Sequence, residues 1–288
     1  MVNPLALAAT LALPAVSMAA AVPTEDLSSD RIIGGQPARP GQFPATLTIL
    51  RNGRHYCGAT LVGRHLAVTA AHCLDEGYSG MSVRAGSIYP TSGGVESRVR
   101  SVRQHPNYRA HLKNHDFDIA LLYLQDPIDA GGNIAYAPLP SPGSDPSGRG
   151  TAAGWYVHTH SVLAQIPLPG IYLASFMLSL SFFFETNRGH TAWQGQNSDV
   201  LRHVTVPITN RQTCRAKHSS LGLEITNNMV CAGGQGKDAC QNDSGGPFYQ
   251  TGSNTLIGVV SFGEKCATEY GGVYARVSNF VDWIKQNA

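Results

Sequence analysis

The chain has 288 residues, enough for one or two domains with a sizeable core. Only 14 % of the residues are charged, 31 are glycine, and the formal net charge is +2. This composition favours a turn-rich β protein over a helical bundle. So small a charge, with no lysine-rich run, argues against nucleic acid as a partner.

The first 21 residues have the features of a secretory signal. An apolar stretch, residues 5–16, leads into the small residues 19–21, where a signal peptidase can cut, although no basic segment precedes the stretch. We therefore expect a signal peptide over residues 1–21 and a secreted, extracellular product. A buried N-terminal helix is the alternative reading.

Residues 22–31 form a short, polar and acidic segment that ends in Arg31. Such a segment is a poor core and a good exposed site for proteolysis. We expect it to be an activation propeptide.

From Ile32 onward, short apolar runs alternate with turn residues. Residues 46–50 are followed by Arg51-Asn52-Gly53, and residues 256–260 form another such run. Runs of this length between turns predict antiparallel strands of a sandwich or barrel. The Pro/Gly/Ser-rich stretch 138–150 divides the rest of the chain into comparable halves and is the predicted interdomain linker.

One helix is predicted, at the C-terminus. Phe280, Trp283 and Ile284 share one helical face, and Ser278 can cap the N-terminal end.

One block does not fit the pattern. Residues 156–188 number 33 and include a strongly apolar part, 171–184, unlike a surface loop. We hypothesise that the block is a translated, unspliced intron, because the codons for Trp155-Tyr156-Val157 can hold a splice donor and an AGG codon for Arg188 the acceptor. A genuine insertion and a membrane anchor are the alternatives. The apolar part has 14 residues, short for a span of about 20, so we expect no membrane association.

The cysteines agree with export. Their even count suits an oxidising compartment, and no pair has the spacing of a zinc site, so no metal is predicted. Spacing alone does not choose the disulfide pairing. The six are Cys57, Cys73, Cys214, Cys231, Cys240 and Cys266.

Three segments together offer the groups that hydrolyse a peptide bond: a nucleophile, a base to activate it, and donors for the oxyanion. They are Thr69-Ala70-Ala71-His72-Cys73, Asp118-Ile119-Ala120-Leu121-Leu122 and Asp243-Ser244-Gly245-Gly246-Pro247. With this order of His, Asp and Ser, the chain resembles the chymotrypsin-fold serine proteases, and trypsins in particular, including those that fungi secrete. The resemblance runs from Ile32 to Ala288, apart from the block 156–188.

The resemblance implies a catalytic triad. His72 would take the proton of the Ser244 hydroxyl, and Asp118 would hold the imidazole in the right tautomer. Asp116 is a nearby competitor for the role of Asp118. The backbone N–H groups of Asn242 and Ser244 would bind the oxyanion.

Activation and specificity follow from the same resemblance. Cleavage after Arg31 would free Ile32, whose new ammonium would pair with the buried Asp243. Asp238 matches the carboxylate at the floor of the trypsin specificity pocket, which selects Arg or Lys by charge pairing. The walls of that pocket and the strand that binds substrate would include Ser261, Gly263 and Gly272.

The resemblance also selects one pairing of the cysteines, which is Cys57–Cys73, Cys214–Cys231 and Cys240–Cys266. The first bridge would brace the loop of His72 and the last the specificity pocket. Bridges of this kind contribute about 2–4 kcal/mol each.

The chain departs from the family at Asn242, where glycine is usual. The backbone N–H survives, but a side chain there can crowd the substrate. The change also creates Asn242-Asp243-Ser244, a glycosylation sequon.

The resemblance implies an all-β fold of two antiparallel six-stranded β-barrels, chymotrypsin-like, with a C-terminal helix. The N-terminal barrel would cover residues 32–137 and the C-terminal barrel residues 151–288. We expect a monomeric endopeptidase that needs no cofactor, cuts after Arg or Lys, and meets protein substrates and protein protease inhibitors. The alternative is a protease-like binding protein that is catalytically impaired.

Overall fold

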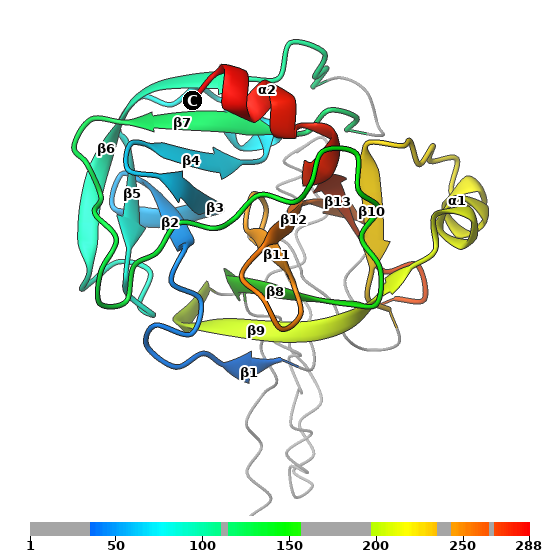
Figure 1. Ribbon diagram of the computed structural model, residues 1–288, viewed down its shortest axis with the longest axis horizontal. Coiled ribbons are helices and arrows are strands. Elements are labelled where there is room, and N and C mark those ends of the chain that lie inside the picture. The colour runs from blue at the N-terminus through cyan, green and yellow to red at the C-terminus, as the bar shows by residue number, and fades with distance from the viewer. Residues whose placement is uncertain (1–34, 111–114, 157–196, 235–242, 265–267) are drawn as a thin grey trace, which may run out of the picture.

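The computed structural model describes residues 35–110, 115–156, 197–234, 243–264 and 268–288. Its strands form two closed antiparallel barrels that pack against each other (Figure 1). The prediction of two six-stranded barrels is confirmed.

The first barrel closes in the strand order β2-β3-β4-β7-β6-β5, with β5 pairing back onto β2. Its hairpin β2–β3 turns at Asn52 and Gly53, whose φ angles of 53° and 74° suit the two-residue turn that joins twisted strands. The strands are β2 (Thr46–Arg51), β3 (Arg54–Gly63), β4 (Leu66–Thr69), β5 (Met81–Ala85), β6 (Val95–Gln104) and β7 (Ala120–Leu124).

The second barrel runs β9-β10-β13-β12-β11-β8, and the pairing of β8 with β9 closes it. A short strand, β1 (Gln36–Pro37), adds to the outside of β9. The barrel strands are β8 (Arg149–Tyr156), β9 (Asn197–Thr209), β10 (Met229–Ala232), β11 (Pro247–Gln250), β12 (Leu256–Gly263) and β13 (Gly272–Arg276).

The predicted C-terminal helix is present as α2 (Val281–Gln286), and Phe280 and Ile284 are buried. It lies over β7 of the first barrel, where the Tyr123 hydroxyl donates to the Asn287 carbonyl at 2.7 Å (Figure 1). The predicted cap is wrong: Ser278 lies in the 3₁₀ turn η2 (Val277–Asn279), and its hydroxyl donates to the Ser144 carbonyl at 2.5 Å. That bond fixes the 138–150 connection instead of the helix end.

A second helix, α1 (Arg211–Ser219), was not predicted. Asn210 caps it by accepting from the N–H groups of Gln212 and Thr213. The helix has few apolar residues, and the Cys214–Cys231 disulfide attaches it to β10.

The two barrels share buried side chains. The largest apolar cluster contains Leu47 and Leu121 of the first barrel together with Tyr249 and Val259 of the second. A core continuous across both barrels fixes their relative position.

Close approach of the barrels requires glycine at position 58. A Cβ on Gly58 of β3 would lie 2.6 Å from the Gly246 Cα, which is backbone of the other barrel. At Gly63 of the same strand a Cβ would only reach Leu66 Cβ, at 3.7 Å.

We predict that Gly58→Ala lowers the free energy of unfolding by about 1–3 kcal/mol, because the barrels must separate to admit the methyl group. Gly63→Ala is the matched control and should stay close to wild type. Urea unfolding of both variants measures the difference, and equal stabilities would contradict the packing described.

Candidate active site

His72 lies in η1 (Ala71–Leu74), the 3₁₀ turn that follows β4. Its Nδ1 lies 2.8 Å from Asp118 Oδ2, and its backbone N–H donates to Asp118 Oδ1 at 2.9 Å. The carboxylate of Asp118 is 1 % exposed and the imidazole 22 %. The side chain that pairs with His72 is therefore Asp118 and not Asp116.

The pair has coupled pKa values. Burial alone lowers the pKa of His72, but the charge and hydrogen bond of Asp118, with a smaller contribution from Asp75, raise it above its ordinary value. Burial raises the pKa of Asp118, and the nearby imidazole and the bonds from His72 and Ser261 outweigh this, so the net pKa is lowered. The carboxylate is thus ionised and can stabilise an imidazolium.

Ser261 of β12 supplies a contact that the sequence did not indicate. Its hydroxyl donates to Asp118 Oδ2 at 2.5 Å, from the opposite barrel. The family resemblance implies for Ser261 only a place on the strand that binds substrate. The two residues are 143 positions apart, and no linear pattern reports such a contact.

Ser244 lies in the loop before β11, and its backbone is fixed to the first barrel. Its carbonyl accepts from the Gly58 N–H at 2.8 Å. Gly245 follows with φ of 76°, and a Cβ there would lie 2.2 Å from Thr69 Oγ1. Only glycine fits so tight a left-handed turn against another strand.

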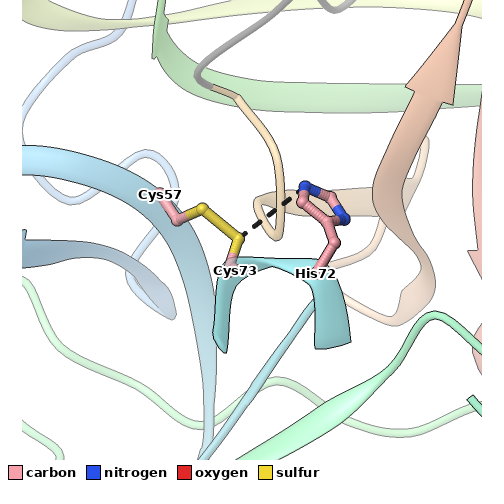
Figure 2. A group of neighbouring side chains, drawn as sticks. All are labelled: Cys57, His72 and Cys73. Carbon is pink, nitrogen blue, oxygen red and sulfur yellow. Dashed lines mark hydrogen bonds between the residues drawn. A yellow bond between two sulfur atoms is a disulfide. The ribbon is translucent and has the colours of Figure 1, made fainter. Parts of the chain in front are cut away.

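The Cys57–Cys73 disulfide connects these parts. Cys57 precedes Gly58 on β3, and Cys73 follows His72 (Figure 2). The Cys73 sulfur lies 4.0 Å from His72 Nε2 and 3.6 Å from the Ser244 carbonyl oxygen. The bridge therefore holds the base and the serine loop at one edge of the first barrel.

In the part of the chain that the structure describes, the Asp118–His72 side of the triad is assembled, whereas the Ser244 hydroxyl makes no hydrogen bond to His72. Asp243, next to Ser244, is 2 % exposed. Its carboxylate packs on β8, since a Cβ at Gly154 would lie 1.9 Å from Asp243 Oδ1.

Two expected wall residues of the specificity pocket face each other. Gly263 of β12 pairs with Gly272 of β13. Several other predicted site residues lie outside the described residues; they are Arg31, Ile32, Asp238, Asn242, and the cysteines Cys240 and Cys266.

Both disulfides between described cysteines have the pairing that the resemblance implies, Cys57–Cys73 and Cys214–Cys231. Their sulfurs are covalently bonded and offer no thiolate to a metal. Among the described residues, the other cluster with metal-ligand atoms is His72, His115 and Asp118, within 4.8 Å of one another. An ion there would compete with the Asp118–His72 hydrogen bond.

Neither helix in the described part of the chain has the length and apolar character that a membrane span requires.

We predict that NMR titration finds the pKa of His72 above that of an ordinary histidine, and that Asp118→Asn lowers it, because the variant loses the charge that stabilises the imidazolium. A Ser244→Ala background prevents autolysis during the measurement. Asp129→Asn, which changes a surface carboxylate paired with Arg64, is the control. An unchanged pKa of His72 in Asp118→Asn would contradict the coupling.

Comparison with known proteins identifies the family. The chain matches the model of the trypsin family over residues 32–170 and 184–284, and the break between these ranges falls inside the block 156–188. Alkaline trypsin C of Manduca sexta is 34 % identical over 279 residues, which cover 93 % of this chain and 95 % of the relative. Trypsin delta of Drosophila erecta is 32 % identical over 262 residues, covering 90 % of this chain and 88 % of the relative.

A solved structure gives the same answer for the fold. Neuropsin, a serine protease expressed in the limbic system of mouse brain, superposes with a TM-score of 0.69 at 27 % identity, covering 88 % of this chain and 98 % of neuropsin. These relatives do not test the narrower resemblance to fungal trypsins. Because the family model and relatives of comparable length match most of the chain, the protein belongs to the trypsin family and is a serine endopeptidase of the chymotrypsin fold.

Proposed function

We propose that His72, Asp118 and Ser244 are the catalytic triad of a secreted endopeptidase that cuts after Arg or Lys. The observation that carries the proposal is the pairing of the buried Asp118 with His72, at 2.8 Å, beside a serine loop bonded to the same barrel. A base oriented by an ionised carboxylate is what an otherwise weak hydroxyl nucleophile needs.

The chemistry follows from the positions of these groups. His72 Nε2 takes the proton from Ser244 Oγ as the oxygen attacks the carbonyl carbon of the substrate. The tetrahedral intermediate then expels the amine, which receives that proton from His72. Water repeats the sequence on the acyl-enzyme, and no cofactor enters. The N–H groups of Ser244 and Asn242 would stabilise the oxyanion.

Activation is the second part of the proposal. Cleavage after Arg31 would release the ammonium of Ile32, and that group would pair with Asp243. Asp243 is buried and directly precedes Ser244, so an ion pair there would act on the serine and oxyanion loop.

Secretion, with a signal peptide over residues 1–21 and a propeptide over 22–31, completes the proposal. We also propose the barrel limits 32–137 and 151–288, except that β8 of the second barrel begins at Arg149, inside the expected linker 138–150. We propose a monomer that meets protein substrates and protease inhibitors presenting an Arg or Lys side chain. For the block 156–188 we keep the intron hypothesis; the family match omits residues 171–183 within the block and includes residues 156–170 and 184–188.

We predict that Ser244→Ala lowers kcat on an arginyl amide by roughly 10⁴-fold or more in the processed protein. Ser147→Ala, which changes an exposed serine, is the control.

The wild-type rate should fall as the pH drops through the raised pKa of His72, because the protonated imidazole accepts no proton.

The experiment is run on the chain with and without residues 156–188. Activity in either form supports the triad. A fully processed protein that is inert in both forms, and that a serine-directed phosphonate does not label, would favour the impaired binding protein.

Specificity has its own test. We predict that Asp238→Ser lowers kcat/KM for cleavage after Arg and Lys by roughly 10²-fold or more, because the pocket loses the carboxylate that pairs with the substrate cation. Asp238→Glu keeps the charge and should retain part of this preference. Unchanged cleavage after Arg in Asp238→Ser would exclude the assigned pocket.

A further inference from the structure

The short loop that carries Asp118 has a strained backbone. His115 and Phe117 have φ angles of 44° and 57°, a region that side chains with a Cβ seldom adopt. The Phe117 carbonyl accepts from the Ile119 N–H at 2.7 Å, which makes a tight turn centred on Asp118. Strained conformations persist only where surrounding contacts enforce them. The contacts that enforce this one therefore also position Asp118.

Asp116 supplies such contacts. Its Oδ1 accepts from the Phe117 N–H at 2.9 Å and from the Thr226 hydroxyl at 2.9 Å. The same oxygen accepts from Asn228 Nδ2 at 3.1 Å. Thr226 and Asn228 directly precede β10, so one carboxylate oxygen ties the loop of the first barrel to the second.

The donor side of this link, Thr226 and Asn228, is itself fixed. The Asn228 N–H donates to Thr226 Oγ1 at 3.1 Å, and its carbonyl accepts from the Arg276 N–H at 2.7 Å, at the end of β13. Asn279 Nδ2 donates to Asn228 Oδ1 at 3.2 Å. Asp116 is thus anchored to a segment bonded to the C-terminal strand and the turn η2, and not to an isolated loop.

From these contacts we infer that Asp116 is a positioning residue, which clamps the strained turn to the second barrel and so aims Asp118 at His72. The inference rests on the proposed catalytic role of Asp118. Asp118 is then held twice from the second barrel: its side chain by Ser261, and its backbone turn through Asp116. Without the clamp the turn relaxes, and the carboxylate leaves the geometry that stabilises the imidazolium.

The test compares Asp116→Ala and Asp116→Asn in the processed protein. Asp116→Ala should lower kcat on an arginyl amide by roughly 10- to 100-fold, as expected for misplacement of a catalytic group, with KM little changed. The acid limb of the pH–kcat profile of Asp116→Ala should move to lower pH, because His72 loses part of the stabilisation of its charged form. Asp116→Asn keeps the Oδ1 acceptor and should restore most of kcat and the wild-type pH profile.

Two further variants complete the design: a control at the surface, and a variant that removes the donors to Asp116 in the second barrel. Asp129→Ala removes an exposed carboxylate of the same barrel and should match wild type. If Asp116→Ala does not fold, Thr226→Val combined with Asn228→Leu removes the two side-chain donors while Asp116 remains, and should lower kcat and shift the acid limb in the same direction.

The outcomes are distinguishable. An inert wild-type enzyme defeats the proposed triad. Wild-type kinetics and pH profile in a folded Asp116→Ala variant, or in the double variant, overturn the clamp while leaving the triad intact.

Discussion

The burial of one charge organises this molecule. Asp118 is 1 % exposed and ionised, and burying a carboxylate is costly unless hydrogen-bond donors replace the lost water. The donors come from two places: the N–H and imidazole of His72 in the first barrel, and the hydroxyl of Ser261 in the second. Because neither barrel satisfies the carboxylate alone, the site exists only when the barrels are packed together.

The packing of the two barrels therefore also determines the geometry of the site. The apolar cluster that joins the barrels sets their separation, and Gly58 and Gly245 allow the serine loop to approach β3 and β4 closely. The Cys57–Cys73 bridge adds a covalent link between β3 and the turn that carries His72. A small shift of one barrel would displace the nucleophile from the base, and catalysis is sensitive to such shifts.

The sequence predicted strands from local patterns, whereas the two barrels and the pairing of His72 with Asp118 were implied by the family resemblance that its motifs carry. Short apolar runs between turns indicate strands, and the three motifs surrounding His72, Asp118 and Ser244 are specific in combination. The contacts of Ser261 and Asp116 could not be predicted from the sequence, because they join residues more than a hundred positions apart. The Ser278 cap failed for a related reason. Its hydroxyl has a local use as a helix cap, but a distant carbonyl, that of Ser144, accepts from it instead.

The central claim is that the buried carboxylate, the imidazole and the serine hydroxyl act as one unit across the two barrels. A crystal structure of the processed enzyme, inactivated by an arginine-like phosphonate, tests this most directly. The account predicts phosphorus bonded to Ser244 Oγ, with His72 still on Asp118 and its Nε2 within hydrogen-bonding distance of the adduct. Phosphorus on another residue, or an imidazole turned away from Asp118, would contradict the account.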